Sequence, residues 1–440
     1  MTDMPFSDNA APGWADLYAE RAVEQVCDLG ADGRARISVR QVAGIAARAV
    51  GPARTCFIQS GLPGRELDLA EIASLAPLAT AGRLRLELSA LAELAAASTD
   101  GREGWLADAR DLLETARAAA LEAGGRHAQA RLWRQHRSYA TSGGGGQAAQ
   151  VSEMLRLTVT VRNGSARGTA SAADVPAAPL TMARAAAAGR QAAADAAAAS
   201  AAVSPASGTT AVIFAPEPAG VLVHEIVHAL EADIARESPL WATRASWSAH
   251  PALTVVDDPR DPWAWEQVAV DEEGTACRRA DLIRGGQVVG VLADRASAAR
   301  LGRDRTGHGR RGSYASPPVP RMRHTVASAG PDPAASIVAG TGHGILIRTV
   351  ETADAIPGQG RFSLRVLSGR EIVNGVAGQP LTGFTITGGL AEFRSLDAIG
   401  DDQRASISVC GRQGRWLPVS HSAPTLRFPQ LTVRGGRAAA

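Results

Sequence analysis

The feature that most constrains this chain is an apolar segment that contains two histidines and a glutamate. Residues 221–233 read VLVHEIVHALEAD, which has the length and the apolar spacing of an α-helix. His224 and His228 are four residues apart, so on a helix their imidazoles project from one face. Two neutral imidazoles in this arrangement can bind one tetrahedral zinc ion, and the adjacent Glu225 can activate a zinc-bound water as a base. Because polar groups in an apolar helix are costly unless they are liganded, the segment favours a metal site over a pair of incidental histidines.

A catalytic zinc site needs a third protein ligand and an open position for water. The extended H-E-x-x-H-x-x-G-x-x-H signature is absent, because Glu231 and Ile234 stand where it requires Gly and His. Glu231 and Asp233 lie too close on the same helix to complete a tetrahedron, so we interpret them as partners of the histidines. A carboxylate further along the chain is an alternative third ligand, and the candidates are Asp257, Asp258 and Glu272.

Length and composition limit what this segment can belong to. The chain has 440 residues, so we expect an N-terminal domain over residues 1–207 and a C-terminal domain over residues 208–440. The net charge of +2 is close to balance and argues against a nucleic-acid-binding protein. The sequence shows neither an apolar run long enough to cross a bilayer nor the pattern of a secretory signal. Four widely spaced cysteines do not form a disulfide framework, so the expected compartment is the cytoplasm.

The N-terminal half mixes helical and strand patterns and predicts an α/β domain. Apolar residues at helical spacing predict three helices, over residues 17–29, 67–79 and 105–123. Two short segments rich in β-forming residues lie between the first two helices, at residues 36–50 and 55–59.

The end of the N-terminal domain carries two further signals. Residues 155–162 alternate between apolar and polar and end in Asn163-Gly164, which predicts a hairpin turn. Residues 184–202 are mostly alanine, which favours a helix that closes the domain over a flexible linker.

The C-terminal half has a different texture. A short buried strand is expected over residues 211–214, followed by a turn at residues 216–220 and then the helix with the two histidines. Beyond the helix, short Val/Ile/Leu runs punctuated by Gly and Pro predict a mostly antiparallel β domain. The expected fold class is therefore α+β, with the β-rich C-terminal domain carrying the H-E-x-x-H helix.

Several segments of this half together point to a known family. The segment HEIVHALEAD resembles the zinc helix of the TldD/PmbA family of metallopeptidases. Three later segments resemble further blocks of that family: VDEEGTACRRADLIRGGQVVGVLADRASAARLG, GHGRRGSYASPPVPRMRHT and SVCGRQGRWLPVSHSAPTLRFPQLTVRGG. The resemblance covers about residues 212–436, whereas the first domain fits only loosely. In the family a cysteine of the last block completes the zinc site, and Cys410 occupies that position.

The resemblance also implies an activity and an assembly. Members of the family act on small or unfolded peptides, often modified ones, inside a closed chamber made by two subunits, one of which commonly lacks zinc. With His224, His228 and Cys410 in place, this chain resembles the active subunit. The expected partners are a peptide substrate and a second subunit, in a homodimer or in a heterodimer with a related chain.

The sequence departs from the family at two points. The family's usual motif is H-E-x-x-x-H, one residue longer than the spacing here. Residues 420–423 stand where the family has an apolar, glycine-rich stretch. They include His421, and the preceding GRQGRWLP suggests a turn that returns His421 toward the metal end of a sheet. There a neutral imidazole can donate to a developing oxyanion, whereas the alternative is an exposed loop histidine.

Three arginines in the segment GHGRRGSYASPPVPRMRHT have two interpretations. Arg310, Arg311 and Arg321 can hold a peptide carboxylate or carbonyl through charge-assisted hydrogen bonds. They can equally form structural ion pairs.

We therefore predict a zinc metallopeptidase that hydrolyses amide bonds in small or unfolded peptides, with Glu225 as the base. One alternative is that the scaffold performs a tailoring reaction, a deacylation or rearrangement in specialised metabolism, as the two departures suggest. Another is a partner subunit that binds metal only for structure, although such a subunit has no need of an intact Glu225.

Overall fold

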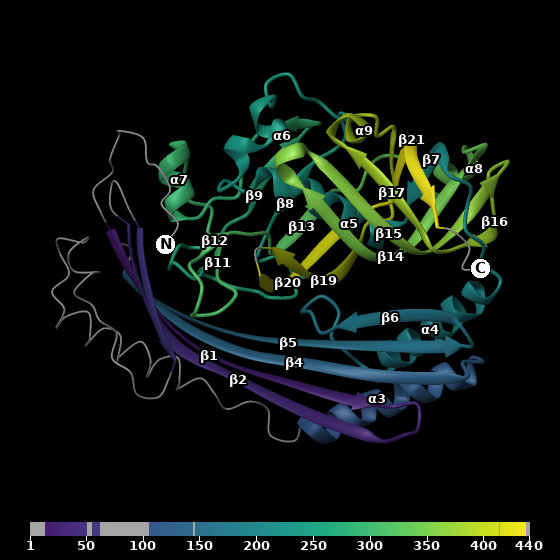
Figure 1. Cartoon of the computed structure of the whole chain (residues 1–440), viewed down its shortest axis with the longest axis horizontal. Helices are drawn as coiled ribbons and strands as arrows, with labels where there is room; N and C mark the ends of the chain where they lie inside the picture. Colours follow the sequence, from purple (N-terminus) through teal and green to yellow (C-terminus); the bar gives the residue numbers. More distant parts are fainter. Residues whose placement is uncertain (1–13, 51–54, 62–104, 144–145, 413, 437–440) are drawn as a thin grey trace.

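The structure is a computed structural model that describes residues 14–50, 55–61, 105–143, 146–412 and 414–436. It has a mixed α+β fold built mostly from strands, arranged as an N-terminal lobe and a C-terminal lobe that face each other (Figure 1). The helix expected over residues 67–79 lies outside the described residues. Among the helices in the described ranges, none is both long and apolar enough to span a membrane.

The N-terminal lobe is a six-stranded sheet with two helices packed on one face. Its strands lie in the order β3-β2-β1-β4-β5-β6, and the described neighbours pair antiparallel. The strands are β1 (Trp14–Leu29), β2 (Ala35–Val50), β3 (Thr55–Gly61), β4 (His127–Gly143), β5 (Gly146–Asn163) and β6 (Ala166–Ala173). The helices α3 (Trp105–Glu122) and α4 (Met182–Ser200) pack on the sheet through small and branched apolar side chains.

The expected helix over residues 17–29 is wrong, because this segment forms β1. The strand is central in the sheet and pairs with β2 on one side and with β4 on the other. This pairing satisfies the backbone on both edges and overrides the local helical preference. The alternation of the strand then buries Asp16, Tyr18 and Glu20 on the face turned toward the C-terminal lobe.

Other expectations for this lobe hold. The β-rich segments form β2 and β3, and the third predicted helix is α3. Asn163 and Gly164 lie in the tight turn between β5 and β6, where Gly164 has a φ of 65°.

The alanine-rich segment forms α4, as expected, and its composition has a packing reason. A Cβ at Gly189 would lie 2.1 Å from the carbonyl oxygen of Ala116 on α3. A Cβ at Gly168 on β6 would lie equally close, 2.1 Å, to the carbonyl oxygen of Ala192 on α4. Small residues allow this close approach of helix to helix and of helix to sheet.

The C-terminal lobe contains two larger sheets. One has the order β10-β9-β8-β13-β20-β19, and the other has the order β14-β7-β21-β17-β15-β16, with β18 (Ala398–Ile399) paired to β21. The strands of the first are β8 (Val255–Asp257), β9 (Ala280–Arg284), β10 (Gln287–Val288), β13 (His324–Ala327), β19 (Arg404–Arg412) and β20 (Arg415–Ala423). The strands of the second are β7 (Gly208–Phe214), β14 (His343–Ile356), β15 (Arg361–Val373), β16 (Val376–Leu381), β17 (Phe384–Gly389) and β21 (Leu426–Gly435).

Most pairings in this lobe are antiparallel, as expected, and the parallel exceptions are β13 with β20 and β14 with β7. Short helices and a two-stranded ladder complete the lobe: α6 (Pro239–Ala242), α7 (Arg295–Leu301), α8 (Ala334–Ala339), α9 (Leu390–Arg394), β11 (Gly309–Arg310) and β12 (Val319–Pro320).

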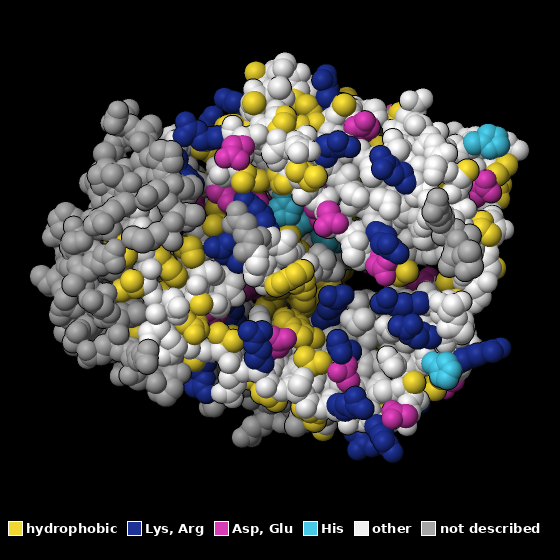
Figure 2. All heavy atoms as spheres, in the orientation of Figure 1, with side chains coloured by type: hydrophobic (Ala, Val, Ile, Leu, Met, Phe, Trp, Pro, Cys, Tyr) yellow, Lys and Arg dark blue, Asp and Glu magenta, His cyan; other side chains and the backbone are white. Residues whose placement is uncertain are grey.

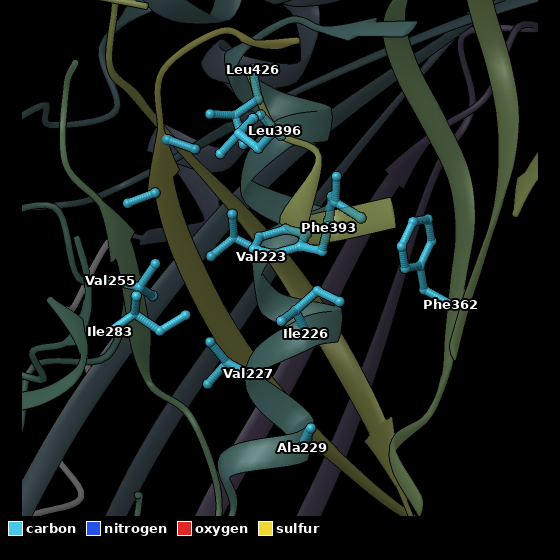
Figure 3. Packing of buried hydrophobic residues seen from close by; sticks show 14 of the residues in the cluster. Val223, Ile226, Val227, Ala229, Val255, Ile283, Phe362, Phe393, Leu396 and Leu426 are labelled. Atoms are coloured by element: carbon cyan, nitrogen blue, oxygen red, sulfur yellow. The ribbon is translucent and has the colours of Figure 1, made fainter. Parts of the chain in front are cut away.

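The helix with the two histidines, α5 (Pro216–Val227), packs against both sheets of this lobe. Its apolar face contributes Val223, Ile226 and Val227 to the main core (Figure 3). The helix begins at Pro216, where a turn was expected, because proline is well tolerated in the first helical turn. It also ends earlier than expected, since His228 already belongs to a single 3₁₀ turn, His228–Leu230.

The two lobes meet at a buried group of ion pairs, which we call the interlobe ion cluster. Its members are the carboxylates Asp16, Glu20, Glu266, Glu272 and Glu273 and the arginines Arg48, Arg137, Arg310, Arg311 and Arg323. Every one of these side chains is at most 5% exposed. Arg323 lies 2.8 Å from both Glu266 and Glu272. Of the two interpretations of Arg310 and Arg311, the structure therefore favours structural ion pairs.

Candidate metal centre

The face of α5 that turns away from the core lines a cavity of about 490 Å³. Val221, His224, Glu225 and His228 form this wall, and their spacing of three and four residues places them in one stripe along the helix. The other walls come from β14 and from the hairpin of β19 and β20. A single helix thus presents an apolar stripe to the core and a polar stripe to the cavity.

Three residues at this cavity can hold a metal ion. The ligand atoms of His224, His228 and Cys410 all lie within 4.8 Å of one another. The side chains are buried, with 3%, 5% and 8% exposure, and the two imidazole centroids are 4.9 Å apart. Cys410 comes from β19, and its Sγ lies 3.2 Å from Nε2 of His228. In the described residues, Asp257, Asp258 and Glu272 do not belong to this group.

Glu231 fixes the orientation of His228. Its Oε2 lies 3.0 Å from Nδ1 of His228, so Nε2 of that ring faces the Cys410 sulfur. Burial alone would lower the pKa of His228, but the Glu231 carboxylate and the Cys410 side chain outweigh it and raise the pKa to about 10. Burial raises the pKa of Glu231, yet His228 and the nearby arginines bring it below its usual value.

Two arginines surround Glu231 and link it to the other predicted site residues. Nε of Arg321 lies 3.3 Å from Glu231, and Nη2 of Arg321 donates to the Cys410 sulfur at 2.8 Å. Arg412 pairs with Glu231 and also donates to Asp233 at 2.7 Å. Asp233 thus contacts Arg412, whereas Glu231 is the carboxylate that reaches a histidine. Arg412 carried no signal in the sequence.

His224 provides the test of whether the group fits a metal. Within the described part of the chain, neither Nδ1 nor Nε2 of His224 has a hydrogen-bond partner, although the ring is 3% exposed. Leaving buried polar atoms unpaired costs about 1–3 kcal/mol each. Burial, followed by the positive charge on His228, holds the pKa of His224 well below its usual value. A neutral imidazole with a free nitrogen lies beside a second imidazole and a sulfur, and this donor set fits zinc when His228 gives up its Nε2 proton to the binding of the ion.

Glu225 lies on the same stripe and lines the cavity. Burial raises the pKa of its carboxyl group, and Asp354 on β14 adds to the effect, while His228 opposes it. The arrangement places a carboxyl group beside the three candidate ligands without making it a member of the group.

His421 reaches the cavity from β20, as the predicted turn suggested. Its ring centroid is 6.2 Å from that of His224. Nδ1 lies 2.7 Å from the hydroxyl oxygen of Ser406, and Nε2 lies 3.3 Å from that of Ser408. Burial, with a further contribution from His324, lowers the pKa of His421 to about 3, so the ring is neutral at pH 7. The two serines were not anticipated, because only the register of β19 and β20 brings Ser406 opposite His421 and Ser408 to the next position on the same face.

A second unanticipated part of the site is the wall formed by β14. Residues 350–355 of this strand line the cavity. Up to Ile347 the strand lies between β7 and β15, but beyond it the described pairings of β14 are with β15 alone. The backbone on the other edge therefore faces the cavity region as an unpaired strand edge. No motif marks this segment in the sequence.

Comparisons with known proteins identify the family of the C-terminal lobe. Residues 207–435 match a family model described as the PmbA/TldA metallopeptidase C-terminal domain. A metalloprotease TldD homolog of Haemophilus influenzae is 30% identical over 240 residues, which are 53% of this chain and 50% of that protein. A zinc metalloprotease TldD homolog of Saccharolobus solfataricus is 27% identical over 235 residues, 53% of each chain. The chain thus spans about half the length of the curated relatives it matches.

The fold as a whole is also similar to a solved structure. TldE from Thermococcus kodakarensis superposes with a TM-score of 0.71, covering 96% of this chain and 97% of that one. The sequence identity of 16% limits this similarity to the fold.

Proposed function

Because the chain belongs to the PmbA/TldD family of metallopeptidases, we propose that it hydrolyses amide bonds in small or unfolded peptides with the help of a zinc ion. His224, His228 and Cys410 would hold the ion. The observation that carries the proposal is the buried His224, whose two nitrogens have no partner in the described ranges, in the same helical stripe as Glu225. A structural cluster of this burial would pair those nitrogens with protein groups.

Glu225, Glu231 and Arg321 would have different roles in this reaction. A zinc ion held by these three residues would supply Lewis-acid chemistry at the scissile carbonyl. Glu225 takes a proton from the attacking water in the cavity and returns a proton to the leaving amine nitrogen. Glu231 holds the ring of His228, and Arg321 holds the sulfur of Cys410, so both candidate ligands are oriented in advance.

The unpaired edge of β14 supports a peptide as the substrate. An extended peptide can add to a free strand edge through backbone hydrogen bonds, which do not depend on its sequence. The edge lies along the same cavity as Glu225, so such a peptide would have its backbone beside the carboxyl group.

One observation favours a second candidate function. His421, in the stretch that departs from the family, forms part of the cavity wall, and its hydroxyl partner Ser408 lines the same cavity. A changed wall can select a modified amide, as in a tailoring reaction, and a panel of plain and modified peptides distinguishes this activity from peptide hydrolysis. Subunit pairing, which the family resemblance implies, is a further proposal that sedimentation can test.

The central test is the replacement Glu225→Gln. If Glu225 is the base and not a ligand, the variant keeps about one zinc per chain and loses at least about 10²-fold in turnover of unstructured peptides. Zinc content and turnover are measured on the same preparation. Glu217→Gln is the matched control, because Glu217 lies on the same helix but is not part of the cavity wall, and its turnover should stay unchanged. Unchanged turnover in Glu225→Gln contradicts the proposal, and loss of zinc assigns Glu225 to the metal instead.

A further inference from the structure

The open face of the N-terminal sheet carries a polar groove of about 750 Å³ near the ends of β1, β2, β4, β5 and β6. We call it the arginine groove, after Arg36, Arg131, Arg162 and Arg167 in its lining. The polar lining residues of β4 and β5 alternate with those that pack under α3 and α4, so their side chains lie on the opposite face of the sheet. In Figure 1 the two helices lie behind the sheet, and Figure 2 shows basic side chains gathered at this end of the N-terminal lobe, beside the hollow between the lobes.

The charges in the groove do not balance. Five arginines line it against two aspartates, which leaves an excess of three positive charges (5 − 2): the residues are Arg34, Arg36, Arg131, Arg162, Arg167, Asp28 and Asp32. Asp28 forms an ion pair with Arg131 at 2.6 Å, and Asp32 lies 3.8 Å from Arg34. Arg36 and Arg162 are exposed, and within the described ranges neither has an acidic partner.

Two of the arginines lie in positions where their like charges lower the stability of the sheet. Arg162 on β5 and Arg167 on β6 are direct cross-strand neighbours. Like charges in directly opposed positions destabilise a sheet. Glu351 lies 3.6 Å from Arg167 and offsets part of its charge, whereas Arg162 has no acidic partner in the described ranges, so a bound anion would chiefly offset Arg162. Thr160 and Thr169, also direct neighbours in the groove, add hydroxyl donors for it.

The arginine groove adjoins the metal cavity. Arg167 lines the groove, Glu351 lines the cavity, and Nη1 of Arg167 lies 3.6 Å from Oε1 of Glu351. We propose that the arginine groove binds an acidic segment of the peptide whose amide bond is cleaved at the metal centre. This inference rests on the function proposed above, and it adds a substrate class, peptides with a carboxylate-rich segment next to the cleaved region.

The groove fits an acidic peptide better than a nucleic acid. Proteins that bind single strands use aromatic side chains on which bases stack, and no aromatic residue lines this groove among those described. The net charge of +2 for the whole chain also lacks the broad basic field typical of such proteins.

The test is a binding measurement on the full-length, zinc-loaded Glu225→Gln chain, in which bound peptide is not consumed. Fluorescence anisotropy compares a labelled oligo-glutamate peptide with oligo-glutamine and with a single-stranded DNA oligonucleotide. Oligo-glutamate should bind most tightly, and added salt should weaken it, because exposed charges are screened. Arg162→Gln and Arg36→Gln should each weaken its binding about tenfold, the scale of one charge-assisted hydrogen bond.

Arg110→Gln is the matched control, since it removes the same charge from an exposed position on α3 and should leave the affinity unchanged. Thermal unfolding of each variant verifies that it is folded. Equal binding by Arg162→Gln, equal binding of oligo-glutamine, or tighter, Arg162-dependent binding of DNA each overturns the proposal. A changed sedimentation coefficient for Arg162→Gln at unchanged peptide affinity also overturns it, because a second copy then covers the groove. Loss of affinity in Arg162→Gln, in a protein whose parent hydrolyses no peptide, contradicts the proposed function and leaves the groove as a peptide-binding site.

Discussion

The metal centre and the interlobe ion cluster are both buried and polar, but they treat their charged groups in opposite ways. In the interlobe ion cluster each carboxylate contacts at least one arginine, and Asp16, Glu266 and Glu272 contact two or more. In the metal centre neither nitrogen of the His224 imidazole has a partner among the residues that the structure describes. Burial of polar groups alone therefore does not identify a functional site. The informative feature is a buried ionisable ring with both nitrogens unpaired among the described residues. Arg310, Arg311 and Arg323 leave only Nε unpaired and donate through their other nitrogens.

The same contrast separates the arginines of residues 307–325, the segment GHGRRGSYASPPVPRMRHT. Arg310, Arg311 and Arg323 belong to the interlobe ion cluster, where Arg311 pairs with Asp16 of the other lobe and Arg310 and Arg323 pair with carboxylates of their own lobe. Arg321, which is close to them in sequence, contacts Glu231 and Cys410 at the metal centre. Residues 310–323 thus contribute side chains both to the interlobe ion cluster and to the metal centre. Substitutions in each region test whether the regions are energetically distinct.

The largest effect on folding is expected from Arg323→Ala. The truncation leaves Glu266 and Glu272 buried with one fewer partner each, so the free energy of unfolding should fall by about 3–5 kcal/mol. Denaturant titration measures the loss. Arg365→Ala is the control, because it breaks the exposed pair with Glu351 and should cost less than about 1 kcal/mol. Similar losses in both variants would mean that the interlobe ion cluster has no special role in stability.

A smaller effect on the free energy of unfolding, measurable only when zinc is present, is expected from Cys410→Ala. Zinc at 100 times its dissociation constant should stabilise the parent chain by about 2.7 kcal/mol, and the variant should lose this gain together with its zinc. Metal analysis and thermal unfolding, each with and without zinc, measure both effects. Cys277→Ala removes another buried cysteine of the same lobe and should keep its zinc. Full zinc content in Cys410→Ala would place the third ligand elsewhere and would weaken the distinction between the metal centre and the interlobe ion cluster.

The smallest effect on stability is expected from Gly220→Ala on α5. A Cβ at this position would lie 2.6 Å from Nδ1 of His421, so the ring must move and release Ser406. The better helix propensity of alanine offsets part of the strain, which leaves a net loss of about 1 kcal/mol. Thermal unfolding checks the loss. Gly208→Ala is the control, since a Cβ there meets nothing within 4 Å. A Gly220→Ala chain as stable as its parent would show that the ring has room to move.

The sequence predicted the part of the site that lies on one helix. His224 and His228 could be paired from spacing alone, because residues four apart share a helical face. Cys410 could not, since it reaches the histidines only through the packing of β19 against α5, and it was found through family resemblance. Ser406, Ser408 and the edge of β14 carried no signal for the same reason: cross-strand register decides what they face.

Local patterns also failed where neighbouring strands overrule them. Residues 17–29 have apolar positions that suit a helix, yet β2 and β4 capture the segment as the central strand of a sheet. The arginine groove was missed on similar grounds, because Arg36, Arg131 and Arg162 come from three strands distant in sequence. The repulsion between Arg162 and Arg167 appears only once their cross-strand register is known.

The separation of the candidate ligands along the chain has a consequence for how the protein is made. His228 and Cys410 are 182 residues apart in sequence. A ribosome therefore releases both histidines and Glu225 well before it adds the residue that completes the group. During that interval the growing chain has only two of the three ligands, and two ligands hold a metal ion more weakly than three. Any activity that depends on the complete group of three ligands therefore begins only after Cys410 has been added to the chain.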